Sequence, residues 1–162
     1  MYNRLDAMAL AGVAGPLAFI SAWTLGAVGT GMDYSSIDDA ISRLAAMGAD
    51  TRWLMTAGFV VFGISLPVFG GALRRTLTGG AWLAAVLTGL ATLGVAATPL
   101  DRSAAVDTLH GIFATAGYVS LVAVPTGLFQ RAGLSSTDVW LVIAASMMAT
   151  GRLSDTRVTD GR

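Results

Sequence analysis

Charged residues fall in clusters along the chain, and the stretches between the clusters have the length of membrane-spanning helices. About 20 mostly apolar residues are needed to cross the roughly 30 Å hydrocarbon core of a bilayer. Four stretches contain no Asp, Glu, Lys or Arg: Ala7–Met32, Trp53–Leu73, Thr76–Leu100 and Thr108–Gln130. The pattern predicts an all-α protein, a polytopic transmembrane helical bundle with spans at about residues 8–29, 53–73, 79–98 and 109–129.

A fifth apolar run, Val139–Gly151, is shorter than the other four. Runs of about 10–14 apolar residues are ambiguous between a span and a buried or interfacial segment. The helix-start signal Ser135–Asp138 precedes the run, which is apolar on all faces and so suits immersion in lipid. We expect a thin or tilted fifth span at about residues 136–151 and a polar tail over residues 152–162, within a single transmembrane domain over residues 1–162. The alternative is a run that lies along the cytoplasmic surface or re-enters the membrane.

The segment between the first two stretches combines capping side chains with apolar residues at helical spacing. Short polar side chains that can cap free backbone N–H groups are Ser35, Ser36, Asp38 and Asp39. Apolar residues that share one helix face are Ile37, Ile41 and Leu44. The segment Ser36–Met47 is therefore predicted to be a short amphipathic helix, on the outer membrane boundary or over the mouth of the bundle.

Small residues recur every four positions in two of the stretches. They are Ala14, Ala18, Ala22 and Gly26 in the first stretch, and Ala81, Ala85 and Gly89 in the third. Small residues allow membrane helices to approach each other closely. Both ridges therefore predict packing against other helices.

The placement of arginine predicts the orientation in the membrane. Cytoplasmic loops are enriched in Lys and Arg, and the basic residues that would share one side are Arg4, Arg74, Arg75 and Arg131. The opposite loops, Thr30–Arg52 and Leu100–Thr108, hold six acids against three arginines. We therefore expect a multi-pass protein of the cell membrane with a cytoplasmic amino terminus. A cleaved signal peptide is disfavoured, because the first stretch exceeds the usual apolar core of about 7–15 residues and contains Pro16.

Composition and charge support a membrane location and exclude several chemistries. Charged residues make up 12% of the chain, against about 25% in soluble domains, and the mean hydropathy is +0.68. The net charge is zero, so nothing indicates nucleic acid as a partner. All ten basic residues are Arg, Cys is absent and His110 is the single histidine. These counts exclude a lysine Schiff base, thiolate-held metals and paired-histidine haem, and we expect no cofactor.

Three passages carry a resemblance to a known family. They are Gly12–Pro16, the stretch from Asp39–Ser42 through Gly48 into Trp53–Phe59, and the Pro99–Asp101 turn with His110–Gly111. These passages resemble the bacterial and archaeal membrane family called domain of unknown function 998, over roughly residues 7–130. The resemblance implies a bundle, usually of six helices, with no established activity. Two departures are Arg43, where the resemblance implies an acid, and a carboxy-terminal part that is atypical or truncated.

Polar residues of the two outer loops form the candidate site. They are Asp38, Asp39, Asp101, Asp107 and His110, of which the last two are three apart and so share one helix face. Carboxylates and an imidazole can bind a cation, a lipid head group or a metal ion, and an imidazole beside an aspartate can accept a proton. The alternative is that they are solvated loop residues and helix caps. No nucleophile or second base is evident, so no catalytic residue is assigned and an enzyme stays an open alternative.

Three functional classes remain for comparison. An accessory or scaffold subunit, which packs against other membrane proteins or itself, fits the small-residue ridges and ranks first. A lipid- or cation-binding protein with a polar site on the extracytoplasmic face is the alternative, with membrane lipids as partners. A transporter component is disfavoured, because no charge lies near the centre of the four spans, where carriers usually place one.

Overall fold

The computed structural model describes residues 4–31 and 34–123, all within one compact unit, Met1–Val124. These residues form the helices α1 (Arg4–Gly29), α2 (Arg52–Thr76), α3 (Ala81–Ala97) and α4 (Ala104–Ala123), with a short 3-10 helix, η1 (Ile41–Ala45), between α1 and α2. No strand occurs in this part of the chain, which confirms the all-α fold class. The expected fifth span and the polar tail lie outside the described residues.

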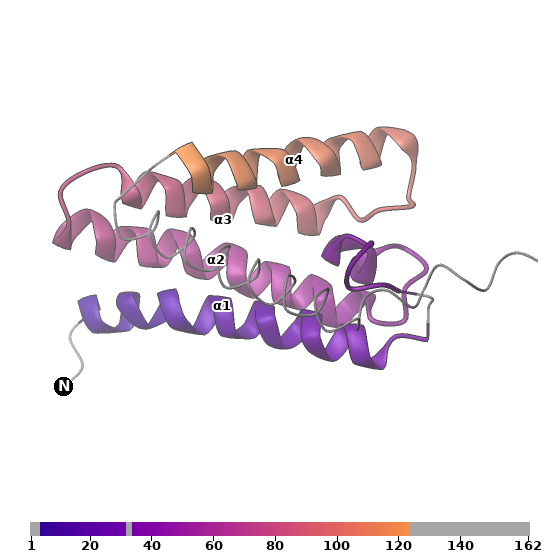
Figure 1. Cartoon of the computed structure of the whole chain (residues 1–162). Helices are drawn as coiled ribbons and strands as arrows, with labels where there is room; N and C mark the ends of the chain where they lie inside the picture. Colours follow the sequence, from indigo (N-terminus) through magenta and orange to yellow (C-terminus); the bar gives the residue numbers. More distant parts are fainter. Residues whose placement is uncertain (1–3, 32–33, 124–162) are drawn as a thin grey trace, which may run out of the picture. The chain divides into compact units, whose positions relative to one another are not determined.

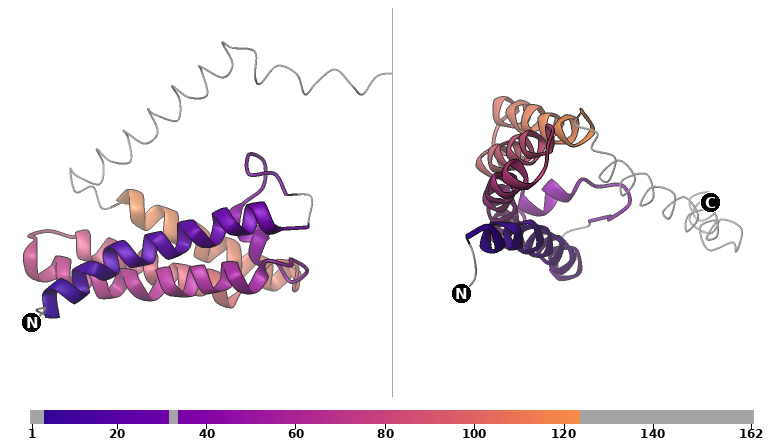
Figure 2. Two further views of the ribbon diagram at one scale, coloured as in Figure 1. Left: turned by 90° about the horizontal axis from the view of Figure 1, so that it is seen from below. Right: turned by 90° about the vertical axis from the view of Figure 1, so that its left-hand side faces the viewer.

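The four helices follow one another in space as they do in sequence. α1 packs against α2, α2 against α3 and α3 against α4, and consecutive helices run in opposite directions (Figure 1). Seen along the helix axes, the row curves into an arc, and η1 lies on its concave side (Figure 2). The amino-terminal α1 and α4 form the two ends of this row, so one side of the arc stays open among the described helices.

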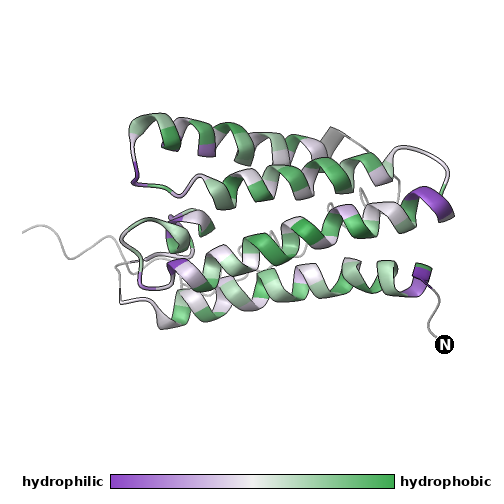
Figure 3. Ribbon diagram, turned by 180° about the vertical axis from the view of Figure 1, so that it is seen from behind, coloured by the Kyte–Doolittle hydropathy of each residue, from purple (hydrophilic) through white to green (hydrophobic). Residues whose placement is uncertain are grey.

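Hydropathy along the helices matches the predicted membrane spans only in part. Hydrophilic residues gather at the helix ends and apolar residues occupy most of the length between them (Figure 3). Two helices, α1 and α2, are long and apolar enough to cross a membrane, whereas α3 is apolar but shorter. Membrane crossing by four or five helices therefore stays a prediction.

Small residues set the close contacts between neighbouring helices. A Cβ built at Gly15 of α1 would lie 2.6 Å from the Cβ of Ser65, and one at Gly58 of α2 would lie 2.5 Å from the Cβ of Ala22. A Cβ on Gly89 of α3 would lie 2.7 Å from the carbonyl oxygen of Gly63. Side chains of any size would hold these helices further apart. Of the predicted ridges, Ala22, Gly26, Ala81 and Gly89 are buried within the chain, whereas Ala14 is exposed.

The predicted amphipathic helix Ser36–Met47 is wrong over most of its length. Residues 36–38 form a turn, and only Ile41–Ala45 is helical, as η1. The hydroxyl of Ser35 accepts hydrogen bonds from the N–H groups of Ile37 and Asp38, 3.3 and 3.1 Å away, which closes a local turn in competition with a helix. Ile37 is consequently 82% exposed and does not pack on the bundle; contact with lipid, the other alternative for this side chain, stays a prediction.

The apolar residues of η1 nevertheless anchor the loop in the core. Leu44 is fully buried in a cluster with Ala22 of α1 and Met55 and Phe59 of α2, and Ile41 packs against that cluster as a partly buried residue. The hydroxyl of Thr51 donates a hydrogen bond of 3.0 Å to the carbonyl oxygen of Leu44. Ile41 and Leu44, which share one face of the predicted helix, therefore both pack on the bundle although that helix does not form.

Candidate functional site

The two loops at the η1 end of the helices are joined directly. The backbone N–H of Met47 donates a 3.0 Å hydrogen bond to the carbonyl oxygen of Leu100 in the loop between α3 and α4. A side-chain contact lies beside it, because Arg43 Nη1 is 3.3 Å from Asp101 Oδ2. Residues from two predicted outer loops therefore share one end of the row of helices.

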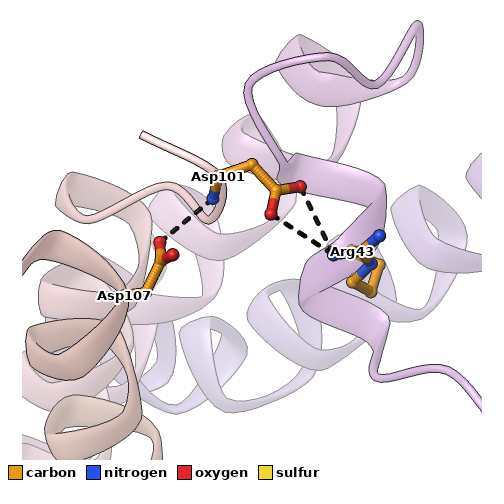
Figure 4. Close-up of polar contacts among 3 residues, drawn as sticks. All are labelled: Arg43, Asp101 and Asp107. Carbon is orange, nitrogen blue, oxygen red and sulfur yellow. Dashed lines mark hydrogen bonds and ion pairs between the residues drawn. The ribbon is translucent and has the colours of Figure 1, made fainter. Parts of the chain in front are cut away.

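Arg43, Asp101 and Asp107 form a chain of polar contacts across these loops (Figure 4). Asp101 has a φ of 63°, a left-handed conformation that Asp tolerates better than most residues, and its N–H donates a 3.0 Å hydrogen bond to Asp107 Oδ1. Asp107 lies in the first turn of α4, where the helix dipole favours a negative charge. The side chains of the Arg43–Asp101 pair are 43% and 54% exposed, so the pair contributes at most about 1 kcal/mol. The pair connects η1 to the loop between α3 and α4.

Asp38 and Asp39 hydrogen-bond within their own turn. Ser35 Oγ is 2.9 Å from Asp38 Oδ2, and the N–H of Ser35 donates to Asp39 Oδ2 at 2.9 Å. Burial raises the pKa of the Tyr34 hydroxyl above its ordinary value of 10.0, and Asp39 raises it further, whereas a hydrogen bond with Ser36 lowers it. The two carboxylates therefore stabilise the loop that precedes η1.

His110 is buried and makes a different contact from the one its sequence position suggested. The side chain is 5% exposed, and Nδ1 lies 2.6 Å from the carbonyl oxygen of Thr98, at the end of α3. Within the described part of the chain, Nε2 is the buried side-chain nitrogen or oxygen atom that has no hydrogen-bond partner. Neither ring nitrogen takes Asp107 as its partner, although the two residues share a helix face.

A pocket of about 310 Å³ opens beside His110, on the side of the helices that faces η1. Aromatic rings from three helices line it: Phe19 of α1, Phe59 and Phe62 of α2, and Phe113 and Tyr118 of α4. Polar groups in the lining are the hydroxyls of Ser42, Thr88, Thr92 and Tyr118 and the imidazole of His110. The volume is at the lower end of the range of about 300–1,000 Å³ for small-molecule sites, which are likewise mostly apolar with few polar groups.

The structure thus separates the five predicted site residues into three groups. The aspartates Asp38 and Asp39 hold one turn, Asp101 and Asp107 join the loops, and His110 enters the pocket. No group of three or more His, Cys, Asp or Glu residues in the described ranges is placed to hold a metal ion. Binding of a cation or head group by these residues is not tested by this geometry and stays a prediction.

The aromatic pocket is a feature that the sequence does not predict. Each ring lies in an apolar stretch where packing or lipid contact explains it without any site. Only the arc of the helices brings rings from α1, α2 and α4 to the same space. The single available signal was His110, a polar residue close to the start of a predicted span.

These features define a small all-α protein with apolar helices and an aromatic pocket that contains one buried histidine. The family model for proteins of unknown function DUF998 matches residues 13–126, which is more than half of the chain. The chain belongs to this family, as the resemblance predicted. Comparison with curated proteins and with solved structures gave no match.

Proposed function

We propose that this chain is a multi-pass protein of the cell membrane that binds an apolar molecule of the bilayer in the pocket beside His110. The observation that carries the proposal is the pocket itself, which is lined by five aromatic rings and by His110, whose buried Nε2 lacks a partner among the described residues. A pocket lined in this way suits an apolar body with one polar group. The lining includes Ala40, Ile41 and Ser42 at the η1 end, which lies near a membrane surface in the proposed topology.

Exposed apolar surface supports the membrane location. Large apolar side chains of α1 are about half exposed, at 54% for Leu10, 55% for Val13 and 58% for Leu17. Such a continuous apolar face is stable in contact with lipid and costly in water. Cation–π pairs lie near both ends of α2, with Arg52 over Trp53 and Arg74 over Trp82. Trp is enriched at membrane–water interfaces. The helical segment from Trp53 to Leu73 is about 30 Å long, which equals the thickness of the hydrocarbon core.

The proposed topology has a cytoplasmic amino terminus and the η1 end outside. The chain contains no Cys, so single cysteines at the exposed positions Ser103 and Thr78 can be labelled cleanly. A membrane-impermeant maleimide should label Ser103→Cys in intact cells, and it should label Thr78→Cys only after permeabilisation. The reverse pattern would contradict the orientation, and labelling of both in intact cells would contradict a span between them.

Native mass spectrometry in mild detergent tests the binding proposal. We expect a monomer that retains an added mass of one lipid-like molecule. Ala114 lines the pocket, so Ala114→Trp should fill it and remove the added mass. Ala116→Trp is the matched control, because Ala116 lies on the same helix, is exposed and does not line the pocket. Retention of the mass by Ala114→Trp, or its absence from the original protein, would overturn the proposal.

An accessory or scaffold role is the second candidate, favoured by the open side of the arc. α1 and α4 end the row of described helices; α1 packs against α2 and η1, and α4 packs mainly against α3. A partner helix or a second copy could cover the exposed side. The small-residue ridges no longer favour this role over ligand binding, because Ala22, Gly26 and Gly89 are buried within the chain. A dimer or a stoichiometric partner protein in the same native spectra, without a bound small molecule, would favour this candidate.

A further inference from the structure

We propose that the pocket selects an uncharged lipid-like molecule that carries a hydroxyl group, and that this hydroxyl donates its hydrogen bond to Nε2 of His110. The inference rests on the proposed ligand-binding function and adds the chemistry of the ligand. It follows from three properties of the pocket: the tautomer of the buried imidazole, the state of the other polar groups and the absence of charge.

The contact with Thr98 fixes the tautomer of His110. A carbonyl oxygen can only accept a hydrogen bond, so Nδ1, at 2.6 Å from the Thr98 oxygen, must carry the proton. In the neutral ring the other nitrogen, Nε2, is then a bare acceptor. His110 lines the pocket, and its Nε2 atom is buried and has no partner among the described residues. A buried acceptor without a donor is costly, so this atom favours a ligand that brings an O–H or N–H group.

The hydroxyls of Thr88 and Thr92, which line the pocket, already have partners. Thr92 donates a 2.8 Å hydrogen bond to the carbonyl oxygen of Thr88, and the hydroxyls of Thr88 and Ser120 are 2.7 Å apart. These bonds lie within or between α3 and α4 and would compete with a ligand. The hydroxyls of Ser42 and Tyr118 also line the pocket but are more exposed than His110, so Nε2 of His110 is the buried polar atom of the described lining that a ligand would satisfy.

The lack of charged side chains in the described lining argues against an ionic ligand. No Arg, Lys, Asp or Glu occurs among the described residues that line it. The nearest basic residue in sequence, Arg43, follows the lining residue Ser42 but is paired with Asp101. A carboxylate or phosphate in this apolar space would lack a counter-ion, and burial of an unpaired charge is strongly unfavourable. A neutral hydroxyl carries no such cost.

The position of His110 fits a membrane amphiphile. The lining extends along α4 from His110 to Leu121, about 16 Å at the helical rise of about 1.5 Å per residue. His110 lies towards the η1 end, where a polar group would be close to the membrane surface, and the rest of the lining on α4 follows towards the middle of the helix. An alcohol with an apolar chain fits this arrangement, with its hydroxyl at His110 and its chain along the rest of the lining on α4.

Nitrogen NMR of the single histidine provides a direct test. Protein labelled with ¹⁵N-histidine in phosphatidylcholine nanodiscs, whose lipid has no hydroxyl donor, gives signals from His110 alone. The probes are dodecan-1-ol, its methyl ether, which keeps the oxygen but loses the O–H, and n-dodecane. We expect an unprotonated Nε2 whose resonance shifts saturably with the alcohol, while Nδ1 stays protonated. The alcohol should bind about threefold to tenfold more tightly than the ether, the usual value of one buried hydrogen bond.

Two variants separate this inference from the proposed function. His110→Phe should remove the preference for alcohol over ether, and Ala114→Trp should block all three probes. Equal binding of alcohol and ether to the original protein would overturn the hydroxyl assignment and leave the pocket as a binding site. A protonated Nε2 in the free protein would overturn the assignment as well. Failure of every probe to bind would overturn both proposals. The measurements on the original protein decide the question even if His110→Phe does not fold.

Discussion

Leu44→Ala is expected to lower the free energy of unfolding by about 2–5 kcal/mol, the range for truncation of a large buried side chain. Leu44 is 0% exposed, and a Cβ at Gly26 of α1 would lie only 3.3 Å from its Cδ1 atom. It is also the residue that holds η1 against α1 and α2, so its loss would leave a cavity between three elements. Thermal unfolding of the detergent-solubilised protein, followed by tryptophan fluorescence, measures the effect.

Ile37→Ala is the matched control for this variant. Both changes truncate an aliphatic side chain in the same loop, but Ile37 is 82% exposed. Its replacement should change the free energy of unfolding by no more than about 0.5 kcal/mol. Equal losses at the two positions would show that the loop is an amphipathic helix after all, with Ile37 packed, and would contradict the turn observed at residues 36–38.

Gly89→Ala is expected to destabilise the protein by about 1–3 kcal/mol, although alanine favours helix. A Cβ at Gly89 would clash with Cδ of Pro67 and would lie 2.7 Å from the carbonyl oxygen of Gly63. Both obstacles belong to the backbone or a rigid ring of α2, so neither can rotate away as a flexible side chain could. The helices α2 and α3 would have to separate, and the loss of their close contact lowers stability. The same fluorescence-detected unfolding measures the loss.

Gly111→Ala tests the same substitution where space is open. Gly111 lies in α4, and a Cβ there meets nothing within 4 Å in the described structure. Alanine should therefore stabilise the helix by about 0.5–1 kcal/mol through its lower conformational entropy in the unfolded chain. A loss at Gly111 as large as that at Gly89 would mean that the destabilisation does not come from the contact between α2 and α3.

Arg43 is the departure from the family resemblance that the structure explains best. An acid at this position would face Asp101, and the two negative charges would repel each other. Arginine instead contacts both carboxylate oxygens of Asp101, at 3.4 and 3.3 Å, across 58 positions of sequence. Arg43 therefore complements the negative charge of Asp101 in the loop between α3 and α4.

The sequence by itself determined the positions of the helices. Long uncharged apolar stretches mark α1 to α4, because each residue's preference for an apolar environment is a property of that residue and needs no knowledge of its neighbours. The start of α4 was placed late, at about residue 109 against the observed Ala104, because Asp107 interrupts the apolar pattern while favouring a helix start. The family was likewise available from the sequence.

The tertiary structure alone decided the site. Whether Ser35 caps a helix or closes a turn depends on hydrogen bonds of similar strength that compete locally. The partner of His110 is a backbone carbonyl group 12 positions away at the end of α3. Every residue has such a carbonyl group, so the sequence does not indicate which one accepts the hydrogen bond. The pocket requires rings from three helices to meet, which depends on how the glycines let the helices approach. Contacts between residues that are distant in sequence depend on how whole helices pack against each other. In a single sequence, the sign of that packing is the scattered small residues that allow close approach.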